Sequence, residues 1–204
     1  MSRIPRCFGE GDALYARYHD EEWGRPVIDE HGLYERLCLE AFQAGLSWRT
    51  VLHKRAALRE VFAQFDPERV AAYGSRETAN LLRDERIIRH RGKIEAAIAN
   101  ARAVLALREQ GRSLVELIWS FAPACPPRYR RFSDAPATTP RSRALASALR
   151  ARGFRFVGPT TAYATMQAAG LVNDHAVECP RHRAVASERE AALRRLAGRS
   201  APGG

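Results

Sequence analysis

One carboxylate in this chain lies inside an apolar stretch. Glu40 is flanked by Leu39 and Ala41, and apolar side chains recur through residues 33–44 at spacings of four and three. That spacing is typical of one buried helix face. A carboxylate buried there must find a partner or shift its pKa, because removing an unpaired charge from water is costly. Gly45 is predicted to end this helix.

The turn after this predicted helix carries two large apolar side chains, Leu46 and Trp48. Two interpretations are open. In the simpler one, Glu40 faces water and the two apolar side chains belong to the core, as in most periodic apolar stretches. In the other, these residues form a pocket with an acidic floor, an aromatic wall and a small apolar wedge at its lip, because exposed large apolar groups usually touch something.

Two cysteine–histidine pairs lie near opposite ends of the chain. Eleven residues separate Cys7 from His19, whereas His175 and Cys179 are four apart and would share one helical face. Two cysteines and two histidines suit a closed, structural zinc site with tetrahedral geometry. The spacing leaves open that these residues bind no metal, because the pairs are far apart in sequence. The competing candidate ligands are His182, Cys38 and Cys125.

Residues 86–94 contain two isoleucines followed by a basic turn with one glycine. A helix, a glycine-containing hairpin and a second helix can direct backbone N–H groups and a helix N-terminus at a phosphate. Arg89, Arg91 and Lys93 would add positive charge. The alternative is an ordinary surface turn, since basic turns are common on basic proteins.

The elements that must position these residues are predicted to be helices. The predicted helices cover residues 13–19 with Asp12 as cap, 33–44, 49–63, a short one from Asp66, 77–82, 94–105, about 142–153 and 160–170. An apolar segment at 113–121 is predicted to be buried, and 122–143 to be an irregular loop. Almost no period-two pattern occurs, so the chain is predicted to be all-α.

Composition places the chain among soluble globular proteins of one domain or two small ones. It has 204 residues, of which 46% are hydrophobic and 27% charged, and a formal net charge of +10. This charge favours nucleic acid over membrane as a partner, although an arginine-rich composition alone would also raise it. Without an apolar run or signal segment, we expect a cytoplasmic protein without a membrane partner, whose four cysteines are free or metal-bound.

Four segments resemble, in order, motifs of the constitutive DNA-3-methyladenine glycosylase I family. Leu14–Gly24 resembles its LYxxYHDxEWG segment, Glu40–Trp48 its ExxQAGLSW, and Ile87–Ile94 its IIRHRGKI. Gly153–His175, followed by Cys179, resembles its GFKFVGxTxxYxxMQAxGLVNDH. The similarity runs from about Cys7 to Cys179.

The resemblance implies an all-α helix-hairpin-helix DNA glycosylase fold. We expect one domain over residues 1–180, with the helix-hairpin-helix near 86–105, and a basic extension over 181–204 that is partly disordered. It also implies a structural Zn²⁺ site that joins the two ends of the chain. Its implied ligands are Cys7, His19, His175 and Cys179.

The resemblance further implies a base pocket and a DNA-contacting edge. The implied pocket residues are Glu40, which is the candidate catalytic group, Tyr18 and Trp48, with Tyr15 and Trp23 nearby. The implied DNA contacts are Gly45 and Leu46, which would probe the gap left by an extruded nucleotide, and the hairpin residues Arg89, His90, Arg91, Gly92 and Lys93. Whether Glu40 is catalytic or only binds the base stays open.

The implied activity is hydrolysis of the N-glycosidic bond of 3-methyladenine in double-stranded DNA, which starts base excision repair. A flipped base and a monomeric enzyme are expected. No lyase activity is expected, because no lysine is clearly placed for a Schiff base. The Asp that related glycosylases place near the hairpin to activate water has no match after Gly92. The alternative is a non-catalytic, zinc-containing binder of alkylated or bent DNA. Two departures from the family pattern bear on this: Phe8 stands in a shortened segment after Cys7, and Arg86 replaces a frequent Gly.

Overall fold

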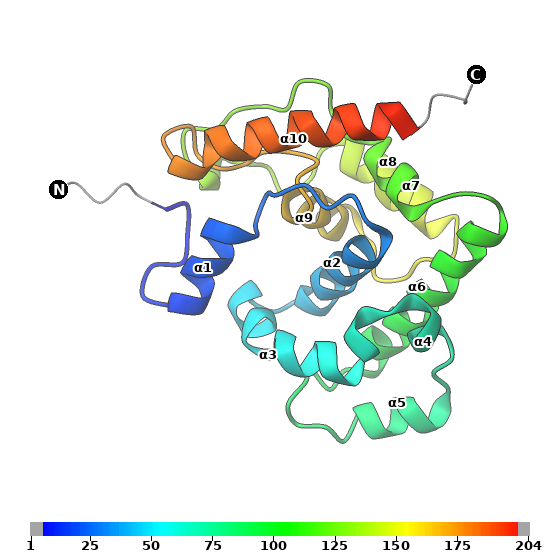
Figure 1. The fold of residues 1–204 in the computed structure, drawn as a ribbon. Helices are drawn as coiled ribbons and strands as arrows, with labels where there is room; N and C mark the ends of the chain where they lie inside the picture. Colours follow the sequence, from blue (N-terminus) through cyan, green and yellow to red (C-terminus); the bar gives the residue numbers. More distant parts are fainter. Residues whose placement is uncertain (1–5, 200–204) are drawn as a thin grey trace.

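The computed structural model describes residues 6–199, and these residues form helices and loops without any strand (Figure 1). The prediction of an all-α protein is confirmed. The helices are α1 (Ala13–Glu21), α2 (Glu30–Gln43), α3 (Trp48–Val61), α4 (Pro67–Ala71), α5 (Ser75–Leu81), α6 (Arg91–Glu109), α7 (Leu114–Trp119), α8 (Pro140–Arg150), α9 (Pro159–Ala168) and α10 (Pro180–Arg199). Two short 3-10 turns, η1 (Ala63–Phe65) and η2 (Phe132–Asp134), lie in the connections.

Helix α2 forms the centre of the domain. It contacts α3, α6, α7 and α9, and Figure 1 shows it enclosed by the other helices. Asp29 caps its N-terminus by accepting a hydrogen bond of 2.7 Å from the backbone N–H of Gly32. Leu33 and Leu37 are fully buried, as the apolar spacing predicts. The helix ends at Gln43, and Gly45 then adopts a φ of +78°, which confirms that Gly45 ends it.

A buried lysine joins the end of α2 to the start of α6. The ammonium of Lys93 donates to the backbone oxygens of Phe42 and Ala44 at 2.8 and 2.5 Å. These carbonyls lie at the end of α2, where intrahelical partners run out, and a cation there is favourable. Because Lys93 is only 5% exposed, the expectation that it contacts DNA is wrong for this side chain. It positions α2 instead.

Several helix boundaries differ from the sequence predictions for local reasons. Helix α8 begins at Pro140 rather than near Ser142, because Thr139 caps it and proline suits the first helical turn. Helix α6 begins at Arg91, because the His90 side chain accepts from the backbone N–H of Lys93. The basic residues of the turn therefore belong partly to the first turn of a 19-residue helix.

The carboxyl end differs most from expectation. Residues 180–199 form α10, which packs against the domain through buried Val185 and Arg189. Arg189 donates to the backbone oxygen of Leu171 at 2.8 Å and also to that of Pro123. Residues 180–199 therefore pack on the domain and do not form a separate extension. Residues 200–204 of the predicted disordered tail lie outside the described residues.

Substitution of Gly170 by alanine is expected to destabilise the protein strongly. Gly170 has a φ of +75°, and an added Cβ would lie 2.6 Å from the backbone nitrogen of Pro26. We expect a loss of about 3 kcal/mol or more, from roughly 1–2 kcal/mol of left-handed strain and about 1–3 kcal/mol of overpacking. Urea unfolding measures this. Gly153→Ala is the matched control, because its φ is +85° and nothing lies within 4 Å of the added Cβ. Equal losses in the two variants would contradict the clash at Gly170.

Candidate functional site

A small pocket opens between α1, α2, the start of α3, and α9. Its volume is about 210 Å³. The lining residues are Phe8, Tyr15, Tyr18, Trp23, Glu40, Gln43, Trp48, Phe132, Ala164 and Gln167. All five residues that the sequence analysis assigned to a base pocket are among them. The structure thus brings together side chains from widely separated segments.

Glu40 supplies the only carboxylate among the described residues that line this pocket. Its side chain is 4% exposed, and its Oε2 has no hydrogen-bond partner. Burial raises the pKa of Glu40 to about 8, and the nearby charge of Arg36 lowers the pKa only in part. The simpler interpretation, in which Glu40 faces water, is therefore wrong. An unpaired buried acceptor is the kind of group that a ligand satisfies.

The walls of the pocket are aromatic. The Tyr18 and Trp48 ring centroids lie 5.1 Å apart at an interplanar angle of 40°, and Phe8 stacks on Tyr15 at 4.7 Å. Trp48 is buried, and its indole Nε1 has no partner among the described residues. Such electron-rich faces around one carboxyl suit a planar, positively charged ring.

The shortened segment after Cys7 contributes to this wall. The Phe8 ring lies 5.0 Å from Trp23 in an edge-on arrangement and 5.6 Å from Phe132. Phe8 therefore forms part of the pocket wall despite the shortened segment in which it stands.

Leu46 and the basic turn lie at the surface. Leu46 is 43% exposed, and nothing lies within 4 Å of a Cβ built on Gly45, so this turn projects freely. In the basic turn, Arg89 pairs with Glu85 at 3.2 Å and Arg91 with Glu95 at 3.5 Å. Both pairs are exposed, and such pairs are weak enough to exchange for a phosphate.

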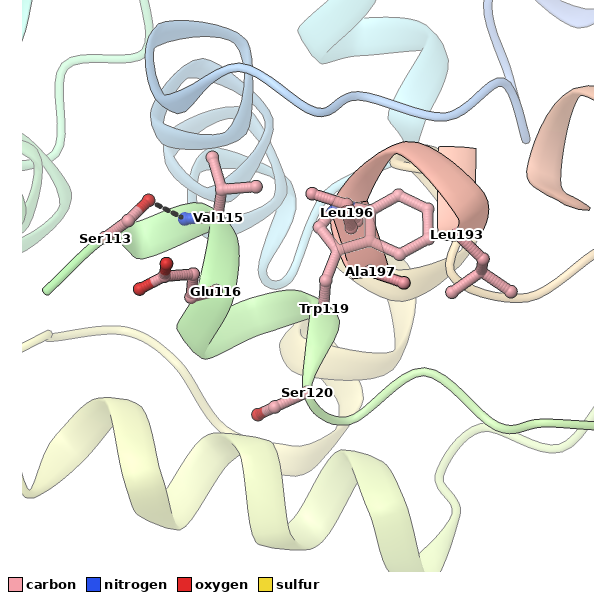
Figure 2. A pocket seen from close by; sticks show the side chains of 8 residues that line it. All are labelled: Ser113, Val115, Glu116, Trp119, Ser120, Leu193, Leu196 and Ala197. Carbon is pink, nitrogen blue, oxygen red and sulfur yellow. Dashed lines mark hydrogen bonds between the residues drawn. The ribbon is translucent and has the colours of Figure 1, made fainter. Parts of the chain in front are cut away.

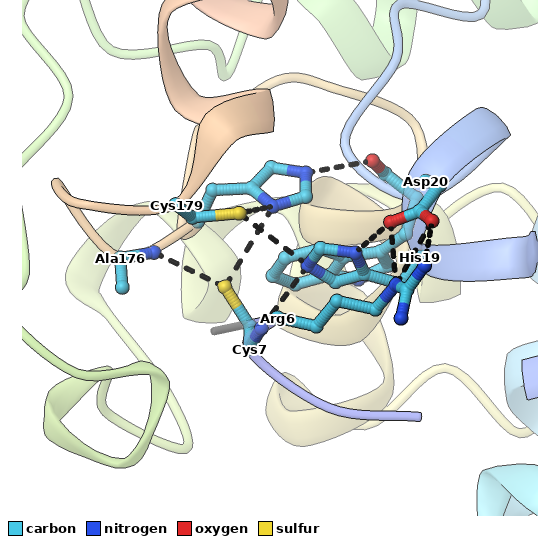
Figure 3. A network of polar contacts seen from close by, with 8 residues as sticks. Arg6, Cys7, His19, Asp20, Ala176 and Cys179 are labelled. Carbon is cyan, nitrogen blue, oxygen red and sulfur yellow. Dashed lines mark hydrogen bonds and ion pairs between the residues drawn. The ribbon is translucent and has the colours of Figure 1, made fainter. Parts of the chain in front are cut away.

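The two cysteine–histidine pairs come together at one point. The ligand atoms of Cys7, His19, His175 and Cys179 all lie within 4.8 Å of one another. Figure 3 shows the contacts around Cys7, His19 and Cys179. Cys179 Sγ is 3.6 Å from His19 Nε2 and 3.5 Å from His175 Nδ1. A tetrahedral zinc ion with ordinary bond lengths separates a sulfur from a nitrogen ligand by about 3.6 Å. The spacing of these atoms fits that ion.

The outer partners of the two histidines orient their rings toward the cluster. His19 Nδ1 lies 2.8 Å from a carboxylate oxygen of Asp20, and His175 Nε2 lies 3.0 Å from the backbone oxygen of Trp23. Because both partners only accept, each of these nitrogens carries the proton, and the other nitrogen directs its lone pair at the cluster. Arg6 in turn donates to Asp20 and holds the pKa of Asp20 at about 2.

The sulfur chemistry agrees with this donor set. A hydrogen bond from the Cys7 side chain lowers the pKa of the Cys179 thiol, which favours the thiolate form that binds zinc. The backbone N–H of Ala176 lies 3.2 Å from Cys7 Sγ. Cys38 is buried elsewhere and Cys125 is exposed, so neither of these competing candidates joins the cluster.

A larger cavity of about 690 Å³ lies between α7 and α10 (Figure 2). Its lining is mainly apolar and includes Trp119 and Leu193. Among its polar residues, Ser113 accepts the hydrogen bond that caps α7. This cavity holds no cluster of groups suited to chemistry, and the small aromatic pocket remains the candidate site.

The sequence analysis missed part of the pocket. Gln43, Phe132, Ala164 and Gln167 line it but were not singled out. Gln43 and Gln167 stand within segments that resemble family motifs, and that signal could have found them. Phe132 comes from the loop at 122–143, whose path no local pattern reveals.

The fold and the pocket together define a helical protein with one buried carboxyl on the floor of an aromatic pocket. The chain belongs to the methyladenine glycosylase family, whose model matches residues 8–182. It is 51% identical over 170 residues to DNA-3-methyladenine glycosylase 1 of Escherichia coli (strain K12). The matched region covers 82% of this chain and 91% of that protein.

Solved structures agree with the family assignment. A crystal structure of 3-methyladenine DNA glycosylase I matches with a TM-score of 0.85 and 50% identity, over 87% of this chain and all of that one. A structure that describes 3-methyladenine recognition by the Staphylococcus aureus enzyme matches with a TM-score of 0.82 and 35% identity, over 86% and 95% of the two chains.

The buried carboxyl predicts an unusual dependence of stability on pH. Between its ordinary value of 4.5 and about 8, the unfolded chain releases the Glu40 proton while the folded chain retains it. The free energy of unfolding therefore falls across this range and then levels off. Glu40→Gln removes this dependence. We therefore expect the free energy of unfolding of the variant to rise relative to that of the wild type between pH 5 and pH 9.

Urea unfolding at pH 5, 7 and 9 measures this difference. Glu109→Gln, which changes an exposed acid at the end of α6, is the matched control and should follow the wild type. A Glu40→Gln difference that stays constant with pH would contradict a raised pKa at Glu40.

Proposed function

We propose that this protein removes 3-methyladenine from alkylated double-stranded DNA by hydrolysing its N-glycosidic bond. This reaction starts base excision repair. The observation that carries the proposal is the buried, unpaired carboxyl of Glu40 on the floor of an aromatic pocket. Membership of the methyladenine glycosylase family supports the same substrate.

A base inside a duplex cannot reach this pocket, so the damaged nucleotide must leave the stack. Unstacking costs a few kcal/mol, and less for a damaged base, which is one source of selectivity. The exposed Leu46 on its projecting turn can fill the space that the nucleotide leaves. We therefore propose Gly45 and Leu46 as the residues that probe the gap.

The pocket distinguishes a cationic base from a neutral one. Adenine methylated at N3 in DNA carries a positive charge, which the faces of Tyr18 and Trp48 attract. The same charge lowers the pKa of Glu40 when the base enters and favours its carboxylate, which accepts hydrogen bonds from the base edge. Neutral adenine carries no positive charge that would offset the cost of burying the Glu40 carboxylate.

The bond that breaks is already weakened by methylation. The methylated base is a good leaving group, so the protein needs to supply little acid catalysis, and water attacks C1′ of the sugar. Glu40 then contributes mainly by binding the cationic base before the bond breaks and favouring the extruded state.

The lysines of this chain support a monofunctional enzyme. The full sequence contains two, Lys54 and Lys93. Lys54 donates to the backbone oxygens of Glu85 and Arg86, and Lys93 holds the end of α2. Neither lines the pocket, so no lysine is available there to form a Schiff base.

The basic turn is proposed as the hairpin of a helix-hairpin-helix. Helix α5, the connection through Arg89 and His90, and helix α6 supply two helices and a tight basic turn. The first turn of α6, with Arg91 and Gly92, would direct backbone N–H groups at a DNA phosphate. Lys93 lends no charge to this contact, because it is buried.

We infer that Cys7, His19, His175 and Cys179 hold one structural zinc ion. The sulfur–nitrogen distances, the two oriented imidazoles and the lowered thiol pKa of Cys179 support this. Zinc bound there would cross-link the two ends of the chain. Because protein ligands fill all four positions of a tetrahedral ion, the site leaves no position for a catalytic water.

Glu40→Gln is expected to lower release of free 3-methyladenine from methylated duplex DNA. Loss of a charged hydrogen bond costs about 1.5–3 kcal/mol, which corresponds to a fall of roughly tenfold to a hundredfold in rate. Chromatography of released bases under single-turnover conditions measures this, and strand cleavage should stay absent. Glu109→Gln should match the wild type. No release by the folded, zinc-loaded wild type would instead support the non-catalytic DNA binder.

Cys179→Ser is expected to lose most bound zinc and to unfold at a lower temperature. Metal content by mass spectrometry and the melting temperature measure the two effects. Cys125→Ser is the control, because that cysteine is exposed and lies outside the cluster. Wild-type protein that purifies without zinc, and takes up none when it is added, would rule out the site.

A further inference from the structure

An exposed aromatic side chain lies beside the basic turn without an assigned role. The large hydrophobic side chains exposed among residues 6–199 are Leu46 at 43%, Phe156 at 37% and Val177 at 36%. The Phe156 ring lies 6.0 Å from the His90 ring, and a Cβ built on Gly92 would be 3.3 Å from it. Phe156 therefore packs on the first turn of α6 while leaving part of its ring in solvent.

The backbone at Phe156 holds this ring outward. Phe156 has a φ of +56°, in the left-handed region that aromatic residues rarely occupy. Two buried residues flank Arg155 and Phe156 in the chain: Phe154 is 2% exposed and Val157 is 1% exposed. A chain that buries both neighbours and still exposes the ring has retained an unfavourable conformation, which is common at functional positions.

A buried asparagine fixes this connector on α6. Asn100, which is fully buried, accepts from the backbone N–H of Arg155 at 2.7 Å and donates to its backbone oxygen at 3.2 Å. These two bonds fix the position of Arg155 and Phe156 relative to the helix that begins at the basic turn.

Arg155 adds a charge that is free to act. Its exposed guanidinium makes no ion pair among the described residues, whereas Arg89 and Arg91 are paired with Glu85 and Glu95. The connector thus presents an aromatic ring and an unneutralised cation side by side.

The connector is continuous with the proposed DNA-binding edge. Lys93 ties the first turn of α6 to Ala44, two residues before Leu46, and Phe156 packs on Gly92 in that same turn. Both exposed apolar side chains are thus connected to one helix start, and the net charge of +10 favours a polyanion at this surface.

We propose that Phe156 and Arg155 form a second contact with duplex DNA, distinct from that of Leu46. The Phe156 ring packs against a base or sugar beside the extruded nucleotide, and Arg155 binds a backbone phosphate. This inference rests on the proposed function, because it places the DNA at the basic turn.

The test uses the zinc-loaded full chain and a duplex with one stable abasic-site analogue, measured over a series of salt concentrations. Phe156→Ala and Phe156→Gly should each weaken binding about tenfold, as loss of one stacking contact does. Phe156→Gly should melt at a higher temperature than Phe156→Ala, because glycine tolerates the positive φ. If the two variants lose equal affinity but differ in melting temperature, the loss of affinity comes from the missing ring and not from impaired folding.

Arg155→Ala should reduce the slope of log affinity against log salt by about one, as loss of one phosphate contact does. The Phe156 variants should leave that slope unchanged. Val177→Ala and Arg195→Ala, which change an exposed apolar side chain and an exposed cation outside this connector, are the controls.

Binding by both Phe156 variants within twofold of wild type would overturn the proposal, as would an unchanged salt slope in Arg155→Ala. Release of 3-methyladenine by the wild type is measured in parallel. Wild-type release with unaffected Phe156 variants refutes only this second contact, whereas no wild-type release refutes the proposed function itself.

Discussion

The burial of one carboxyl in the central helix is the constraint on which the rest of this structure depends. Glu40 lies in α2 among apolar neighbours, and its Oε2 is left without a partner. An unpaired buried acceptor is unfavourable in the free protein, so the surrounding helices must hold it in place. The fully buried Leu33 and Leu37 on the same helix contribute that stability. A planar cation is the ligand proposed to satisfy this carboxyl.

The two ends of the chain converge on the same pocket. Consecutive residues of α1 serve both places, since Tyr18 lines the pocket and His19 faces the cysteine–histidine cluster. His175, from the far end of the chain, donates to the backbone oxygen of Trp23, whose ring also lines the pocket. Joining the chain ends therefore also fixes two walls of the pocket. A structural metal there would act on base binding through position alone.

The surface proposed to face DNA is similarly tied to the pocket. The Lys93 ammonium connects the start of α6 to the last carbonyls of α2, so the basic turn and the turn at Leu46 share one rigid junction. The floor of the pocket at Glu40 lies one helical turn before Ala44. In the proposed function, this junction would link contact of the duplex with α6 to extrusion of a nucleotide past Leu46, which is the positioning that base flipping requires.

The sequence by itself determined the helical class, the central helix with its stop at Gly45, and five of the ten residues that line the pocket, because apolar spacing and long motifs are local signals. It left Glu40 open between water and a pocket, since periodicity does not reveal what covers a helix face. Only the tertiary structure decided that Lys93 faces inward, that residues 180–199 pack on the domain, and that Phe132 reaches the pocket. Each of these depends on contacts between residues far apart in the chain, and side-chain type alone does not encode such contacts.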